Sequence, residues 1–175
     1  MPEWFDDPEW FGDFDAFAHA RSGRIFKLAY SILRNRQQAE DATQEVLIDV
    51  CAKWTRVSTC DRPDAYVTTM VVHECMSMHR KAWFRREAPT APVDLPDPPA
   101  GDEADRVALR VDLIEQLRQL PLQQRTALAL RFDGELTDAE IAKLMDISEN
   151  TVRSHYSKAL ATLRRRMTST RGSGS

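Results

Sequence analysis

The chain has 175 residues, of which 42% are hydrophobic and 29% charged, so it can bury one medium-sized core or two small ones, and we favour two. A net charge of −3 excludes a uniformly basic surface, and an acidic, aromatic beginning without a long apolar run argues against secretion and membrane insertion. We therefore expect a cytoplasmic protein. Apolar residues recur at helical spacing, and β-branched runs between turns are missing, which predicts an all-α fold.

The first twelve residues contain a duplicated Pro-Glu-Trp-Phe element, at 2–5 and again at 8–11. This leader, 1–12, is expected to be disordered, or alternatively to place its aromatic side chains in a groove. A first helical unit is expected at 13–86, and apolar spacing predicts its first helix at 14–35.

A second helix is expected at 38–54, with an apolar face that includes Ala39, Val46 and Trp54. Its other face carries a polar, mostly acidic stripe formed by Asp41, Gln44, Glu45 and Asp49. Such a stripe is usually only solvated. It is also the surface that a basic partner helix would need.

A third helix is expected at 65–86, after Arg62 and with Pro63 near its first turn. Its last residues, 80–86 (RKAWFRR), interleave basic and aromatic side chains, which can bind a nucleic-acid backbone and stack on an unpaired base. The alternative is a helix end that snorkels beside the core.

The cysteines and histidines of this unit do not predict a metal site. His73, Cys75 and His79 are spaced so that they do not share one helix face. Cys51, Cys60 and Cys75 lack CxxC spacing and are odd in number, which predicts reduced thiols.

A proline-rich segment, 87–105 (EAPTAPVDLPDPPAGDEAD), is predicted to be an extended linker between two units. The longer segment 87–115 carries 2 Lys/Arg against 8 Asp/Glu, whereas 61–86 and 116–175 are both net basic. This distribution predicts two basic surfaces separated by an acidic connector.

The second unit is expected at 106–167, before a disordered tail at 168–175, and it contains a helix-turn-helix pattern. Thr137 and Glu140 form a capping box for one short helix, and Ser148 caps the next. After Glu149 all charged residues are basic, which suits a phosphate backbone. An ordinary helical hairpin is the alternative. The second helix would present to a DNA major groove the side chains of Asn150, Thr151, Arg153, Ser154, His155 and Lys158.

Three stretches resemble the extracytoplasmic-function group of bacterial sigma factors, within the sigma-70 family. Residues 39–46 (AEDATQEV) are similar to the family's polymerase-clamp helix, and 62–86 resemble the helix that melts and reads the minus-10 element. Residues 117–125 (LRQLPLQQR) and the helix-turn-helix after them resemble the minus-35 reader. The match covers roughly 14–86 and 113–166, in the family's order.

The resemblance implies a protein that recruits polymerase, with no catalytic activity and no cofactor. Its partners would be core RNA polymerase (the clamp of the largest subunits and the flap), promoter DNA and, as a further candidate, an anti-sigma protein. The residues implied for polymerase binding are Asp41, Gln44, Glu45 and Asp49. Those implied for the minus-10 element are Arg62, His73, His79, Arg80, Trp83 and Arg86. Those implied for the minus-35 element are Asn150, Thr151, Arg153, Ser154, His155, Lys158 and Arg165.

Some positions depart from the family's pattern. His73 stands where Asn is usual, His79 where Arg is usual, and Asp146 replaces the usual Gly of the helix-turn-helix corner, where Asp tolerates a left-handed backbone. Two other classes stay open. A stand-alone helix-turn-helix regulator would leave the acidic stripe without a role, and a thiol or zinc sensor would use the cysteines with His73 and His79.

Overall fold

The computed structural model describes residues 13–85, 113, 115–132 and 136–172, excluding the side chains at 82–85 and 169–172. Every regular element in these ranges is a helix, which confirms the all-α prediction. The predicted leader 1–12 and the linker 87–105 lie outside the described residues.

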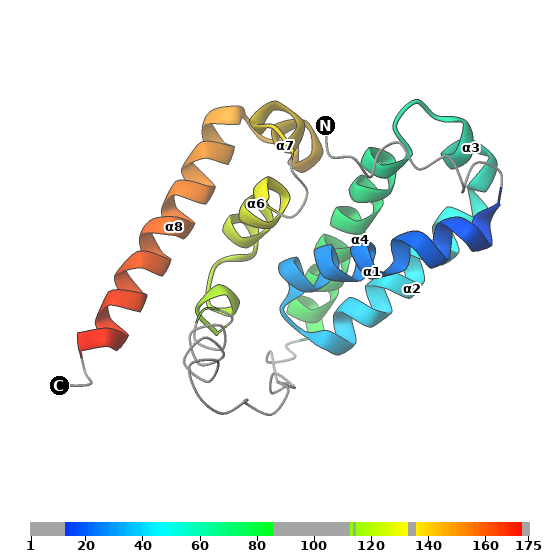
Figure 1. The fold of residues 1–175 in the computed structure, drawn as a ribbon. Coiled ribbons are helices and arrows are strands. Elements are labelled where there is room, and N and C mark those ends of the chain that lie inside the picture. The colour runs from blue at the N-terminus through cyan, green and yellow to red at the C-terminus, as the bar shows by residue number, and fades with distance from the viewer. Residues whose placement is uncertain (1–12, 86–112, 114, 133–135, 173–175) are drawn as a thin grey trace.

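The first two helices form a hairpin: α1 (Phe14–Leu33) and α2 (Arg36–Ala52) (Figure 1). The Asp13 carboxylate caps α1 by accepting from the Asp15 amide at 3.0 Å. α1 ends at Arg34, whose φ of 54° is left-handed, and the Asn35 side chain then caps α2 by accepting from the Gln38 amide at 3.0 Å. These adjacent stop and start signals make the turn short.

The expected helix at 38–54 ends earlier than predicted. α2 stops at Ala52, and Trp54 opens a separate short helix, α3 (Trp54–Thr59). The break turns the chain so that the Trp54 ring meets Phe14 and Phe17 of α1, with centroid separations of 5.8 and 5.3 Å. Aromatic packing between helices therefore overrides the helical period within one segment.

The next helix, α4 (Pro63–Arg85), begins with the proline in its first turn, as predicted. Asp64 in that turn pairs with Arg21 of α1 at 3.1 Å, and both side chains are about nine-tenths buried. This pair fixes the start of α4 against α1. Beneath it lies an apolar core that includes Phe17, Ile32, Val50, Val57, Val71 and Val72.

The C-terminal unit contains α6 (Leu122–Phe132), α7 (Asp138–Met145) and α8 (Glu149–Gly172), the long helix at the left of Figure 1. The predicted capping box is present: Thr137 Oγ1 accepts from the Glu140 amide at 3.3 Å, and Glu140 Oε2 accepts from the Thr137 amide at 2.9 Å. α8 continues past the predicted boundary at 167 to Gly172, so the segment predicted as a disordered tail begins inside a helix.

The two helical units share a core. Leu130 of α6, Ile141 of α7 and Val152 of α8 are fully buried in the same cluster as the core of α1, α2 and α4. A second, smaller cluster joins α6 to α8 through Leu128, Ala159 and other leucines. Both predicted units are present, but their main core is continuous, because the C-terminal unit covers apolar surface of α1 that would otherwise meet water.

Candidate nucleic-acid and protein interfaces

The polar stripe predicted on the second helix lies on α2. Gln44, Glu45 and Asp49 are exposed, whereas Asp41 is half-buried and accepts from the Gln37 amide group at 3.1 Å. Asp49 also pairs with Lys53 at 3.1 Å. The structure brings these predicted polymerase-binding residues together on one side of the helix.

Sequence reasoning missed Ile48, which lies in the middle of this stripe. Its side chain is 62% exposed, and among the described residues Phe132 is the other large hydrophobic side chain that is exposed. A signal was available: Ile48 does not belong to the inward set Ala39, Ala42, Val46 and Val50, so the helical period places it outside. An apolar side chain ringed by polar ones is typical of the centre of a protein-binding surface.

A groove of about 1140 Å³ runs between α2 and α4 on one side and the C-terminal unit on the other. Glu45 and Asp49 line it from α2, and the start of α6 and the end of α7 form its other wall. His73, His79 and Arg80 line it from α4. Predicted polymerase-binding and minus-10 residues thus share one concave surface.

The structure describes most, but not all, of the predicted minus-10 residues of α4 and its end. His73, His79 and Arg80 are exposed on α4. Trp83 belongs to α4, but its side chain is outside the described set, and Arg86 lies outside the described residues. Burial, and then the positive charge of Arg125, lower the pKa of His79 below its ordinary value. His79 is therefore neutral at pH 7 and offers hydrogen bonds rather than charge.

Arg62 contacts the other helical unit. Its Nη1 lies 2.8 Å from Glu140 Oε1 in α7, a residue 78 positions away. The other oxygen of Glu140 serves the capping box with Thr137, so one carboxylate caps a helix and joins two units. Hydrogen bonds from Thr137 and then Arg62 lower the pKa of Glu140. Sequence spacing offers no signal for this pair.

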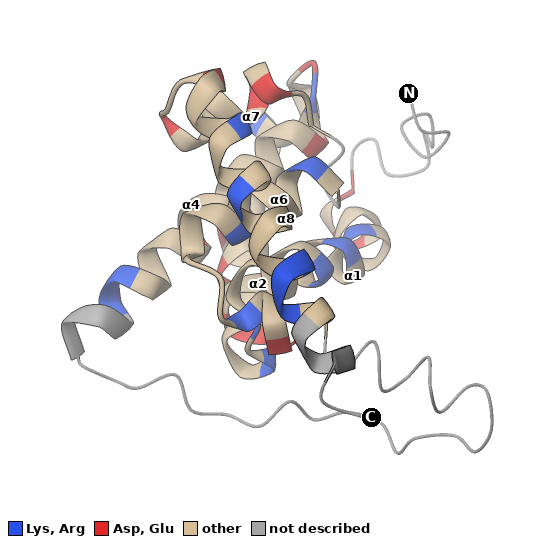
Figure 2. Ribbon diagram, turned by 90° about the vertical axis from the view of Figure 1, so that its left-hand side faces the viewer, with Lys and Arg blue, Asp and Glu red and all other residues tan. Residues whose placement is uncertain are grey.

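The predicted minus-35 residues all lie on α8, and most of them lie in its first three turns. Asn150 and Lys158 are exposed, Ser154 and His155 are half-buried, and Thr151 donates its amide to Ser148 Oγ at 3.1 Å. Val152 is fully buried and anchors the helix on α7. The exposed Arg165 belongs to the basic C-terminal half of α8, which faces the viewer in Figure 2.

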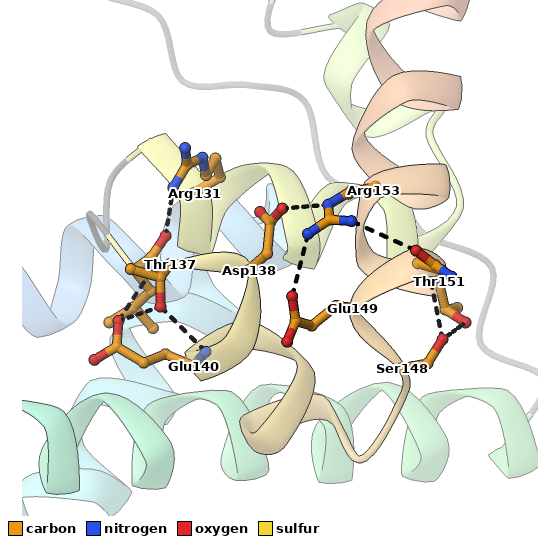
Figure 3. A network of polar contacts seen from close by, with 10 residues as sticks. Arg131, Thr137, Asp138, Glu140, Ser148, Glu149, Thr151 and Arg153 are labelled. Carbon is orange, nitrogen blue, oxygen red and sulfur yellow. Dashed lines mark hydrogen bonds and ion pairs between the residues drawn. The ribbon is translucent and has the colours of Figure 1, made fainter.

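Arg153 is held within the helix-turn-helix. Its Nε lies 2.9 Å from Asp138 Oδ2 of α7, and its Nη2 lies 3.1 Å from Glu149 Oε2 of α8. A longer contact of 3.5 Å joins Nη1 to Asn150 Oδ1. Figure 3 shows the guanidinium between the carboxylates of Asp138 and Glu149. The Arg153 side chain is nevertheless 53% exposed, and its contact with DNA stays a prediction.

Arg125, at the end of the LRQLPLQQR stretch, is buried at the junction of the two units. Its Nε donates to the Ile32 carbonyl at the end of α1, and its Nη1 donates to the Arg118 carbonyl at 2.9 Å. Burial, followed by the charges of Arg34 and Arg118, lowers the pKa of Arg125 to about 10. It stays charged at neutral pH and links the units.

Within the described residues, no three His, Cys, Asp or Glu side chains converge as metal ligands. Cys75 is buried, and burial raises the pKa of its thiol to about 12, so it is protonated at neutral pH. Among the described helices, none combines the length and apolarity needed to cross a lipid bilayer.

Comparisons with known proteins match both units. The family "Sigma-70 region 2" matches residues 17–85, from α1 to the end of α4, and "Sigma-70, region 4" matches residues 110–163, which include α6, α7 and most of α8. The chain is 30% identical over 165 residues to the ECF RNA polymerase sigma factor SigK of Mycobacterium ulcerans, covering 87% of this chain and 86% of that protein. The chain belongs to the extracytoplasmic-function RNA polymerase sigma factors.

Another relative of this sigma factor is the RNA polymerase sigma-E factor of Streptomyces avermitilis, at 26% identity over 159 residues, 90% of this chain and 86% of that one. The fold also resembles that of the sigma factor RpoE of Bartonella quintana, solved in complex with the anti-sigma factor NepR. That match has a TM-score of 0.69 and 18% identity, and covers 89% of this chain and 97% of RpoE. Sigma factors direct transcription initiation and are not a family of catalytic enzymes.

Proposed function

We propose that this sigma factor binds the clamp of core RNA polymerase through the exposed face of α2 formed by Gln44, Glu45, Ile48 and Asp49. The observation that carries this assignment is Ile48, whose side chain is 62% exposed among polar neighbours. An apolar anchor with a polar rim is the arrangement of a stable protein interface, whereas a merely solvated helix face gains nothing from an exposed isoleucine.

The minus-10 element is assigned to the groove-facing side of α4, with His73, His79 and Arg80, and to its last turn, with Trp83 and Arg86. Arg80 is exposed and cationic, which suits a phosphate contact. His73 and the neutral His79 suit hydrogen bonds to base edges. The assignments of Trp83 and Arg86 rest on the sequence resemblance alone.

The minus-35 element is assigned to α8, with its first turns in the major groove and its basic C-terminal half along the backbone. Asn150, Thr151 and Ser154 lie in the part of the helix that reaches base edges in helix-turn-helix proteins. Lys158 and Arg165 are exposed cations further along and suit phosphates.

We retain residues 13–86 as the proposed polymerase-binding domain and residues 106–167 as the proposed minus-35 domain. The proposed location is the cytoplasm, where the polymerase works. An anti-sigma protein is a further proposed partner. The groove between the two units supports it, because a helix bound there would cover Glu45, Asp49 and the α4 histidines together. The related fold of RpoE was solved with such a protein.

The decisive experiment measures binding to core polymerase and to free promoter duplex, followed by run-off transcription on a promoter library. A sigma factor should bind core polymerase tightly and free duplex poorly. A stand-alone helix-turn-helix regulator should show the reverse, and that result would overturn the proposal.

Replacing Arg165 with Ala should weaken all promoters alike. A phosphate contact carries no base information, so the promoter ranking should be preserved while the salt dependence of binding falls by about one unit of slope. Polymerase holoenzyme and fluorescent promoter duplexes at several salt concentrations provide the measurement. A changed base preference would instead place Arg165 at a base edge.

A further inference from the structure

The polar network around Arg153 joins the two helices of the helix-turn-helix. Asp138 belongs to the first turn of α7, while Glu149 and Arg153 belong to the first turns of α8, and the guanidinium bonds both carboxylates (Figure 3). The angle at which these two helices cross determines how α8 would enter a DNA groove. A bond between the helices therefore affects how α8 is placed against the bases.

The carboxylate of Asp138 depends on this arginine. Its side chain is only 19% exposed, and Oδ1 is buried without a hydrogen-bond partner among the described residues. Oδ2 accepts from Arg153 at 2.9 Å. Without the guanidinium, Asp138 would be a half-buried anion close to Glu149 and without a counter-charge, and that repulsion would push the helices apart.

Arg153 also differs from the other cations of α8. Lys158 lies on the same helix, exposed, and no acidic partner holds it in the described structure. The acceptors around Arg153 occupy its Nε, Nη1 and Nη2. A guanidinium bonded in this way has fewer donors for the bidentate contact with guanine that makes arginine a base reader.

We propose that Arg153 is a positioning residue, which fixes the angle of α8 on α7 through Asp138 and Glu149, and that base selectivity at the minus-35 element comes from its neighbours Asn150, Thr151 and Ser154. The proposal rests on the assignment of α8 as the minus-35 reader. It also predicts that Asp138 affects promoter binding. Asp138 lies on the other helix and does not need to touch DNA.

A double-mutant cycle tests this assignment. Arg153→Ala, Asp138→Ala and the double variant are each assembled with core polymerase, and affinity and base preference are measured on duplexes with every substitution in the minus-35 element. Because Arg153 is half-exposed, each single change in a positioning pair lowers affinity by only about threefold, and the double change lowers it no further. All three variants keep the wild-type ranking of bases, and Arg153→Lys, which keeps one ion pair with Asp138, recovers part of the loss.

For a direct base contact, Arg153→Ala flattens the preference at one or two positions, while Asp138→Ala leaves affinity unchanged or raises it by releasing the arginine. That pattern overturns the proposal. Lys158→Ala is the matched control, since its effect should add to that of Asp138→Ala. Lys158→Ala and Arg165→Ala could weaken promoter binding while Arg153→Ala and Asp138→Ala do not. In that case the positioning proposal is wrong and the assignment of α8 to the minus-35 element stands. If no α8 variant changes promoter binding, both fail.

Discussion

A double change of Gln44 to Ala and Glu45 to Lys should abolish promoter-directed transcription by core polymerase. Both side chains are exposed on α2, and the lysine would place a positive charge in a surface that we assign to a basic partner. Exposed substitutions usually change the free energy of unfolding by less than ~0.5 kcal/mol, so helicity and melting temperature should be nearly unchanged. Binding to core polymerase, measured by fluorescence anisotropy or co-elution, should fall by at least about tenfold.

Two further variants separate the possible causes of that loss. Ala20→Lys adds a positive charge to an exposed position on α1 and should leave polymerase binding intact. Ile48→Ser removes the apolar anchor without changing charge; it should weaken polymerase binding but not stability, because Ile48 is already largely in water. Wild-type affinity in the double variant would contradict the clamp assignment, whatever Ile48→Ser does.

Local signals in the sequence predicted the helices well. Ser148 stands before α8 and accepts a backbone hydrogen bond there, and Thr137 with Glu140 forms both halves of its box. Such caps depend on residues within three positions of each other, so a sequence displays them directly. The same locality explains why the polar stripe of α2 was predicted as one surface.

The failures share the opposite property. Trp54 leaves its helix because of aromatic rings about forty positions earlier, and Arg62 meets a carboxylate 78 positions later. Likewise, the spacing of residues along α8 does not reveal that Arg153 meets Asp138 on α7. Tertiary contacts of this kind depend on how helices are placed, which one helix's periodicity does not encode.

The packing of the two units has a consequence for promoter binding. Under the proposed assignments, α4 and α8 bind two distinct elements along one promoter duplex. Here Arg62, assigned to the minus-10 side, lies 2.8 Å from Glu140 of the helix-turn-helix. We therefore expect the two units to move apart when both elements are bound, which requires the contacts between them to break.

Arg125 is the contact whose loss should matter most for that junction. Replacing it with Ala leaves the carbonyls of Ile32, Arg118 and Leu120 without the donor that satisfies them, and opens space at a buried position. Unsatisfied buried carbonyls together with lost packing should lower the free energy of unfolding by about 3 kcal/mol or more. Arg125→Lys should recover only part, since an ammonium cannot reproduce the spread of a guanidinium.

The same variant reveals whether the junction acts as a hinge. If Arg125 holds the units together, Arg125→Ala should raise the radius of gyration in solution scattering while far-ultraviolet circular dichroism keeps most of its helical signal. Glu140→Gln removes the charge that faces Arg62 at the exposed edge. It should raise the radius of gyration less than Arg125→Ala does, because a half-exposed ion pair contributes little to the stability of the junction. An unchanged radius and an unchanged melting temperature in Arg125→Ala would show that the shared apolar core, through Leu130 and Ile141, suffices to keep the units together.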